Sequence, residues 1–287
     1  FTTGATNGAT FTELCIPASV ETIETDAFHK CLNLNTVTFA PGSNLKKIGW
    51  DAFSQKALES ITIPEKVTTI GEGAFYKCTS LGSITIPSSV TSIESRAFSE
   101  CTSLTSVTIP SSVTSIGRGA FNNCSQLEEV TFEAPSGLCE ENNNISDNAF
   151  TGCTKLSKIN CESALKEKLS GVVSEKIISV THWNVKFVTD ANTTTELVEN
   201  NKPVAERTAP AKDGYIFAGW YTKDANDKWA DKPFDFSKAI TDDTTLYARW
   251  GVEATPIGRA TRLYPIAIDY GTAYDADHNV ITKAAAG

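Results

Sequence analysis

Hydrophobic positions recur along the first half of the chain with a period of about 23 residues. Leu58, Leu81 and Leu104 begin three consecutive segments of 23 residues that align without a gap. A unit this short cannot bury its own apolar face, so neighbouring units must stack and share one core. The pattern therefore predicts a solenoid. Each of its six units carries an Ala-Phe pair, at Ala27-Phe28, Ala52-Phe53, Ala74-Phe75, Ala97-Phe98, Ala120-Phe121 and Ala149-Phe150.

Each unit opens with an alternating run that predicts a short β-strand. In the third unit, Ile61 and Ile63 are expected to point into the core, and Ser60 and Thr62 toward solvent. Pro64 ends this strand because it has no N–H to donate to the next strand. Stacking the units aligns one inward ladder of Leu14, Val37, Ile61, Ile84, Val107, Val130 and Ile159. A tight turn is expected further along the units that carry Gly49, Gly71 and Gly117.

The unit LxxITIPxxVxxIGxxAFxxC, which extends from about Phe11 to Cys161, resembles the BspA-type leucine-rich repeat of bacterial surface proteins. The resemblance implies an α/β solenoid of leucine-rich repeats, curved and right-handed, with a short parallel sheet on the concave face. It also implies a cell-surface or secreted protein, because family members are mostly surface-attached and some are adhesins for host matrix proteins. The family shares no catalytic residues, so none is carried over to this chain.

The solenoid is expected to occupy residues 1–161, and residues 162–182 to form a capping helix and linker. Apolar residues recur at helical spacing from Glu162 to Ser179 and predict an amphipathic helix. Its apolar face consists of Leu165, Leu169, Val172, Val173 and Ile177. Such a helix would cover the open end of the stack. Binding of the same face to a membrane or a partner is the alternative.

A shift in composition marks a second domain at residues 183–250, which holds four of the five Trp residues. The segments GYIFAGWYT and PFDFSKAITDDTTLYARW resemble the Listeria–Bacteroides repeat, also called the internalin B-repeat. The resemblance implies a small β-grasp-like module that serves as a spacer or an accessory binding module. The chain departs from the family at Asp190, where a Gly pair usually follows the Asn of the first hairpin. That hairpin is therefore expected to differ.

The aromatic residues of this second domain have two interpretations. Trp220 and Trp250 are expected to form its core, because a domain of this size has little else to bury. The alternative is a carbohydrate platform, for which Tyr221 and Trp229 are the candidate exposed rings.

Residues 251–287 form a tail in which Leu263 to Tyr270 alternates and predicts an added edge strand. Asp275 to Asn279 superficially resembles a calcium loop, but Val280 and Ala286 stand where Gly and Glu are required. We therefore expect no metal there. Because the chain starts at Phe1 without a targeting segment, we expect a processed product whose targeting signal lies outside it.

Five of the eight cysteines share one position of the repeat, at Cys31, Cys78, Cys101, Cys124 and Cys153. We interpret them as buried thiols, since free Cys behaves as a small hydrophobic residue. Disulfides between adjacent units are the alternative, because the expected strand spacing of about 4.8 Å permits them. Cys31 is the exception, since Lys56 takes the corresponding position of the next unit. Cys15 and Cys139 are expected to be the exposed thiols.

The formal net charge of −9 argues against binding to nucleic acid or to anionic lipid. There is no membrane-spanning stretch, and motifs such as HExxH, GxSxG, the P-loop and GxGxxG are missing from the sequence. We therefore expect no enzymatic activity, no cofactor and no catalytic or metal site. A smooth solenoid face also lacks a pocket in which burial could shift a pKa.

The outward residues of the predicted strands are the candidate binding surface for a partner. They are small and uncharged: Thr38, Ser60, Thr62, Ser83, Thr85, Ser106, Thr108 and Thr131. The insertion at Glu133–Glu141 in the sixth unit, with Asn142 to Asn144 after it, is a rival site. The expected partner is an extracellular protein or glycoprotein, bound by a monomer. The alternatives are a structural stalk or spacer and, less favoured, a glycan-binding accessory module.

Overall fold

The computed structural model describes residues 11–29, 31–140, 143–208 and 210–251, together with the backbone of three short strands beyond them. The chain divides into two compact units, residues 1–181 and 182–287. No helix in the described ranges is both long and apolar enough to cross a membrane.

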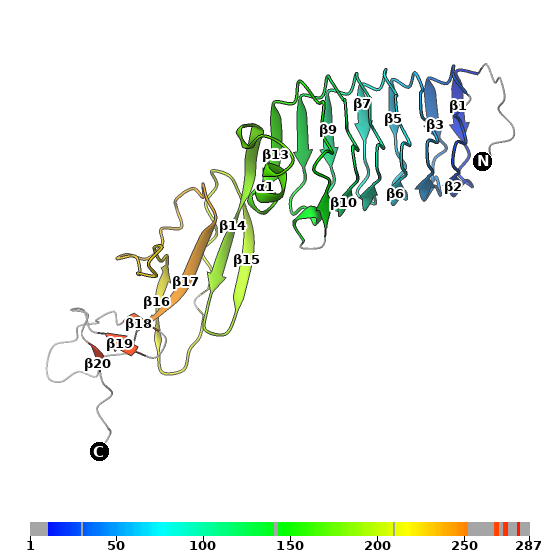
Figure 1. The fold of residues 1–287 in the computed structure, drawn as a ribbon. Coiled ribbons are helices and arrows are strands. Elements are labelled where there is room, and N and C mark those ends of the chain that lie inside the picture. Colours follow the sequence, from blue (N-terminus) through cyan, green and yellow to red (C-terminus); the bar gives the residue numbers. More distant parts are fainter. Residues whose placement is uncertain are drawn as a thin grey trace. The chain divides into compact units, whose positions relative to one another are not determined.

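The first unit is a stack of coils carrying two parallel sheets (Figure 1). Coils 1 to 6 begin at Phe11, Leu34, Leu58, Leu81, Leu104 and Leu127. The first sheet contains β1 (Glu13–Ile16), β3 (Thr36–Phe39), β5 (Ser60–Thr62), β7 (Ser83–Thr85), β9 (Ser106–Ile109), β11 (Glu129–Phe132) and β13 (Lys158–Glu162). The second sheet contains β2 (Thr22–Ile23), β4 (Lys47–Ile48), β6 (Thr69–Ile70), β8 (Ser92–Ile93), β10 (Ser115–Ile116) and β12 (Asn144–Ile145).

The predicted inward ladder is present in the first sheet. Leu14 pairs with Val37, Ile61 with Ile84, and Val130 with both Val107 and Ile159. The second sheet was not predicted. Strands of two residues are too short for alternation to be visible in the sequence.

The core of the stack is a column of parallel phenylalanine rings. Successive ring centroids lie 5.2 to 5.6 Å apart, with interplanar angles of 13° or less. The Ala before each Phe is fully buried or nearly so, and its carbonyl accepts the amide of the Phe in the preceding coil. The column consists of Phe28, Phe53, Phe75, Phe98, Phe121 and Phe150. The repeated Ala-Phe pair thus joins coils through both backbone and side chain.

The glycines expected at a tight turn have a different role. A Cβ atom on Gly71 would lie 2.6 Å from the carbonyl oxygen of Ile48, and one on Gly117 would lie 2.5 Å from the Ser95 nitrogen. The left-handed backbone lies elsewhere in the turn, for example at Asp51 and Lys77, with φ of 50° and 58°. Glycine therefore allows two coils to approach closely, and the turn begins after it.

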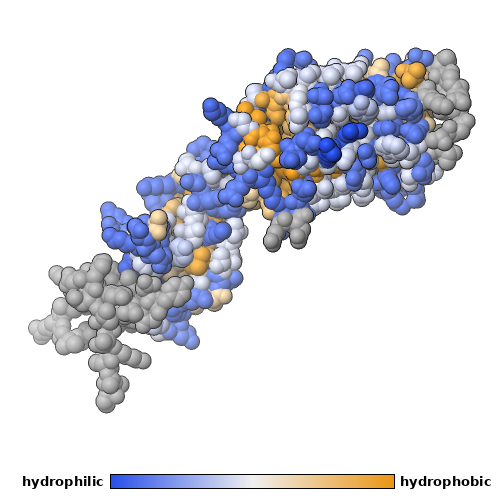
Figure 2. Space-filling view, in the orientation of Figure 1, coloured by the Kyte–Doolittle hydropathy of each residue, from blue (hydrophilic) through white to orange (hydrophobic). Residues whose placement is uncertain are grey.

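The structure differs from the prediction for the segment that follows the repeats. A single helix over Glu162–Ser179 was expected, but α1 covers Ser163–Ser170 and is followed by a 3₁₀ turn, η2 (Glu175–Ile177). Leu165 and Leu169 are buried. The remaining apolar residues of the predicted face, Val172, Val173 and Ile177, pack against the same core from outside the helix. Figure 2 shows hydrophobic side chains gathered over this part of the unit.

The second unit contains a mixed four-stranded sheet. In it, β14 (Ile178–Val188) lies between β15 (Thr193–Glu199), which is antiparallel to it, and β17 (Thr244–Gly251), which is parallel. An outer strand, β16 (Ile216–Tyr221), pairs with β17. Trp220 and Trp250 are 4 % and 5 % exposed within the core of this unit, as predicted. The hairpin that departs from the family pattern is closed by the Thr189 amide, which donates to the Asn192 carbonyl.

The tail contains three short strands, β18 (Ala267–Asp269), β19 (Thr272–Tyr274) and β20 (Val280–Ile281), which pair in antiparallel order. Of the predicted edge strand Leu263–Tyr270, the part outside β18 lies outside the described residues. The loop from Asp275 to Asn279 also lies outside them.

Candidate binding surface of the first sheet

The predicted binding residues lie on the outer side of the first sheet, on β3, β5, β7, β9 and β11. All are exposed except Thr131, which is half-buried because its Oγ1 accepts a hydrogen bond from Asn160 Nδ2 at 3.1 Å. The register pairs Ser60 with Ser83, and Thr62 with Thr85. The strands therefore bring most of the predicted residues into two rows of hydroxyl groups.

The hydroxyl rows end at a charged group on β11 and β13. Lys158 Nζ and Asn160 Nδ2 donate to Glu129 Oε1 at 2.8 and 2.5 Å. The hydrogen bond from Lys158 lowers the pKa of the Glu129 carboxyl. Because Glu129 is already ion-paired and the hydroxyl rows are uncharged, this surface is suited to hydrogen bonding rather than to acid–base chemistry.

A groove of about 610 Å³ lies over β3 and β5. Its lining includes three of the predicted residues, Thr38, Ser60 and Thr62, together with Val37 and Ile61, whose side chains are buried in the core. The rest of the lining is Thr36, Phe39, Ala40, Gly42, Ser43, Pro64, Glu65 and Lys66. Hydroxyl groups beside the partly exposed Phe39 and Pro64 can bind a partner that presents both polar and apolar atoms.

The groove coincides with a break in the first sheet. β3 pairs with β1, and β5 pairs with β7, but no strand pairing joins β3 to β5. A second break of the same kind separates β7 from β9, so the break alone does not make the groove. Coil 2 has 24 residues, from Leu34 to Ala57, and its loop at Pro41 to Asn44 follows β3. Lys66 Nζ donates to Asn44 Oδ1 at 2.6 Å across one end of the groove. Sequence reasoning missed the groove, and the extra residue in coil 2 was the available signal.

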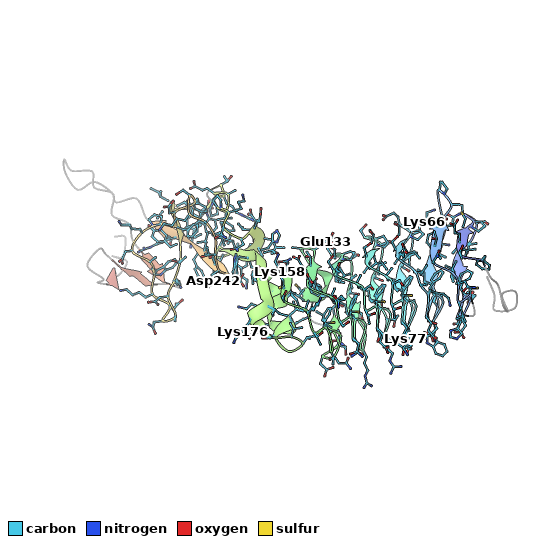
Figure 3. All side chains as sticks on the ribbon, turned by 90° about the horizontal axis from the view of Figure 1, so that it is seen from above. Lys66, Lys77, Glu133, Lys158, Lys176 and Asp242 are labelled. Atoms are coloured by element: carbon cyan, nitrogen blue, oxygen red, sulfur yellow. The ribbon has the colours of Figure 1, made fainter. Side chains whose placement is uncertain are left out.

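Lys66 and Lys77 lie on opposite sides of the solenoid in the view from above (Figure 3). Lys66 belongs to the loop that follows β5, and Lys77 to the turn that follows β6. The groove and the turns between the second sheet and the next coil are therefore separate surfaces.

The rival site in the sixth coil is fixed to the capping helix. The Ser136 amide and Cys139 Sγ both donate to Glu162 Oε1, at 2.5 and 3.0 Å. Lys168 Nζ donates to the carbonyl oxygens of Leu138 and Glu140, at 2.7 and 2.5 Å, and to a third carbonyl at 3.2 Å. These contacts give Ser136 and Cys139 a structural role and hold the insertion against α1. Glu141 and Asn142 lie outside the described residues.

Cys139 is not the exposed thiol that was expected. It is half-buried, and burial followed by the Glu162 hydrogen bond raises the pKa of its thiol to about 12. Cys15 is exposed, as predicted. A thiolate is the reactive form, so Cys139 is protected both sterically and electrostatically.

The cysteines of the ladder are free thiols, as predicted, and those of coils 3 to 6 donate to backbone carbonyls. Cys78 Sγ donates to the Phe53 carbonyl oxygen at 3.1 Å, and Cys101 Sγ to that of Phe75 at 3.2 Å. Burial raises the pKa of Cys78 to about 12. Cys153, in the last coil, is half-buried but makes the same contact, to Phe121.

The aromatic cluster of the second unit does not form an open platform. Tyr221, expected to be exposed, is 6 % exposed. Trp229 is half-buried, with Lys223 Nζ 4.6 Å and the Arg249 guanidinium carbon 5.6 Å from its ring centroid. The rings of Tyr221 and Tyr247 also contact Trp229 edge to face. Because sugars stack on free ring faces, this arrangement does not support the carbohydrate interpretation.

In the ranges that the structure describes, no three His, Cys, Asp or Glu side chains converge as a metal site would require. The stacked coils with a parallel sheet define a β-solenoid of the leucine-rich repeat class.

Comparison with family models supports the same assignment. The BspA type leucine rich repeat region matches in six copies, at residues 5–128, 46–171 and 137–185. These matches cover more than half of the chain, which therefore belongs to the BspA-type leucine-rich repeat family. A second model, the Listeria-Bacteroides repeat domain, matches residues 183–249.

Individual proteins are similar over parts of the chain. Internalin H of Listeria monocytogenes is 34% identical over 86 residues, which are 30% of this chain and 15% of internalin H. The chain thus spans a small part of that relative. Among solved structures, a T. pallidum leucine-rich repeat protein has 31% identity and a TM-score of 0.44, covering 52% of this chain and 68% of that one. A leucine-rich repeat protein from Bacteroides ovatus has 22% identity and a TM-score of 0.34, covering 59% and 54%.

Proposed function

We propose that this chain is a non-enzymatic, surface-exposed or secreted bacterial binding protein that attaches to an extracellular protein or glycoprotein through the first sheet. The groove over β3 and β5 carries the proposal, because it is a concave feature among otherwise regular rows of Ser and Thr. Membership of a family of surface proteins, and the match to the Listeria-Bacteroides repeat, support the location.

The chemistry of the groove favours an extended polypeptide as the bound segment. The facing sides of β3 and β5 do not pair with each other, so their backbone groups can take part in hydrogen bonds to a ligand. Thr38, Ser60 and Thr62 add hydroxyl groups that both donate and accept. Phe39 and Pro64 offer apolar contact for alternate side chains of the ligand.

The test is a binding screen of the purified chain against host matrix glycoproteins and a glycan panel on sensors. A Ser60→Arg/Thr62→Arg variant fills the groove, whereas Ser106→Arg/Thr108→Arg adds the same charge to the sheet outside it. We expect a glycoprotein hit that the first variant abolishes and the second reduces by less than about threefold.

Three other results would contradict this proposal. Equal loss in both variants would indicate a site spread along the whole sheet. A hit that neither variant affects would move the site away from the first sheet. The lack of any hit at high micromolar protein would leave the stalk as the better description.

A further inference from the structure

Trp50 is a large exposed side chain on a turn of coil 2, with 52 % of its surface accessible. The backbone places it directly between coils 1 and 3. The Asp26 amide donates to the Trp50 carbonyl at 2.8 Å, and the Asp51 amide donates to the Glu72 carbonyl at 2.9 Å. The corresponding position of the other coils holds Thr25, Glu72, Ser95, Arg118 and Asp147. A single exposed apolar residue is common on protein surfaces, and only its surroundings can give it a binding role.

The backbone around Trp50 has few side chains. Gly49 precedes it, and Gly71 and Gly73 flank Glu72 in the next coil. A Cβ atom on Gly49 would lie 2.7 Å from the Glu24 backbone, so coils 1 and 2 approach closely here. With glycine at these three positions, the ring of Trp50 is accessible to a ligand that lies along the turns.

The side chains that do stand near Trp50 are mainly acidic. Asp26, Asp51 and Glu72 lie in adjacent rungs of the turns of coils 1 to 3. Burial is the main cause that raises the pKa of the Asp51 carboxyl, and repulsion by Asp26 and Glu72 raises it further. His29 and Arg96 act in the opposite direction. His29 Nδ1 lies 3.9 Å from Asp26 Oδ1, and Arg96 acts on Asp51, but the net shift of the Asp51 pKa is upward. The three carboxylates therefore repel one another, and a bound cation would relieve that repulsion.

We propose that Trp50, together with Asp26, Asp51 and Glu72, binds a basic extended segment of a partner protein. A Lys or Arg side chain of the partner lies over the Trp50 ring, and the carboxylates bind further cationic groups. Cations are attracted to the face of Trp more than to other rings, and Trp is enriched among residues that dominate binding interfaces. The net charge of −9 favours the approach of a basic partner. This surface lies on the turns and is independent of the groove over β3 and β5.

The test measures binding of a fluorescein-labelled ten-residue peptide of alternating Lys and Gly by fluorescence anisotropy, using the whole chain at low salt. An alternating Glu and Gly peptide is the negative probe. Trp50→Thr restores the residue that coil 1 carries at this position, and we expect it to weaken binding about 2- to 30-fold, as the loss of one cation–π contact predicts. Leu32→Thr is its control, since Leu32 is 66% exposed on another turn.

Two double variants that each remove two negative charges distinguish binding at this surface from non-specific attraction to an acidic protein. Asp51→Asn/Glu72→Gln should weaken binding at least fivefold, and Asn tolerates the left-handed backbone of position 51. Glu59→Gln/Glu128→Gln removes the same charge from exposed positions elsewhere and should change binding less than twofold. Equal effects of the two pairs, unchanged binding by Trp50→Thr, or no binding by the wild-type chain would each overturn the proposal.

A second readout reports on Trp50 itself. The fluorescence of the wild-type chain minus that of Trp50→Thr isolates this residue from the four Trp of the second unit. We expect the ratio of caesium to iodide quenching of the difference signal to exceed the ratio for N-acetyltryptophanamide in the same buffer, and the Lys-Gly peptide to protect the signal. A ratio equal to or below that of the free indole would contradict an acidic surrounding. The groove variant Ser60→Arg/Thr62→Arg should bind the peptide within twofold of wild type, so failure of either proposal leaves the other testable.

Discussion

Lys56 donates a hydrogen bond from its buried Nζ to the carbonyl oxygen of His29 at 2.8 Å. It takes the position at which the other coils place a Cys, and only 1 % of it is exposed. Burial lowers the pKa of its ammonium group, while the neighbouring Cys31 and Cys78 act in the opposite direction. Coil 2 thus departs from the repeat in its core as well as at Trp50 and at the groove.

Lys56 gives folding stability a pH dependence that Lys56→Met removes. Lys56 binds its proton less readily in the folded chain than in the unfolded chain, in which the pKa of its side chain is near 10.5. The contribution of Lys56 to the unfolding free energy is therefore lowest at pH values below its lowered pKa in the folded chain. It rises as the pH increases from that pKa to about 10.5. We expect the unfolding free energy of wild type minus that of Lys56→Met, from urea titrations, to increase toward pH 10.5. A difference that is constant with pH would contradict the lowered pKa.

Thiol labelling should distinguish the cysteines by burial. At pH 7.5 we expect Cys15 to react rapidly with a maleimide, and the thiols of Cys78, Cys139 and Cys161, whose pKa values burial raises to about 12, to remain unmodified. Native protein should label rapidly at Cys15 and more slowly at the half-buried Cys153, whose thiol pKa is lowered by its hydrogen bond with Cys124, and denatured protein should label at all eight cysteines. Mass spectrometry of wild type and Cys15→Ser checks both expectations. Rapid labelling of Cys139 would show that the sixth-coil insertion is open in solution.

Removing one ring from the phenylalanine column should destabilise the whole solenoid. Phe98 is fully buried between Phe75 and Phe121, so Phe98→Ala should lower the unfolding free energy by about 3–5 kcal/mol. Ser83→Ala, on the exposed side of β7, should change it by less than about 0.5 kcal/mol. Urea unfolding followed by circular dichroism measures both. Similar losses for the two variants would be inconsistent with the assigned sides of the sheet.

Lys168 should fix the sixth-coil insertion to the capping helix. Lys168→Met removes an ammonium that donates to three carbonyl oxygens, and we expect a loss of about 2 kcal/mol. Limited proteolysis should then cleave within residues 134–143. Lys166→Met, on an exposed position of the same helix, is the control and should remain resistant. Equal resistance of both variants would indicate that Lys168 is not required to hold the insertion.

The features that recur in the coils could be predicted from the sequence alone. The period, the inward ladder, the Ala-Phe column and the thiol ladder were all predictable, because every coil places the same residue in the same environment and stacking requires it. The core position of Trp220 and Trp250 was also predictable, because a small domain must bury its largest apolar residues.

Only the tertiary structure decided what differs between coils. The unpaired strands at the groove, the enclosed faces of Trp229 and the ion pairing of Glu129 depend on residues that are distant in sequence or belong to adjacent coils. Helix α1 ends at Ser170, and the later apolar residues reach the core from irregular backbone. Local periodicity reports which side chains are buried, but the conformation that buries them depends on the surface they pack against.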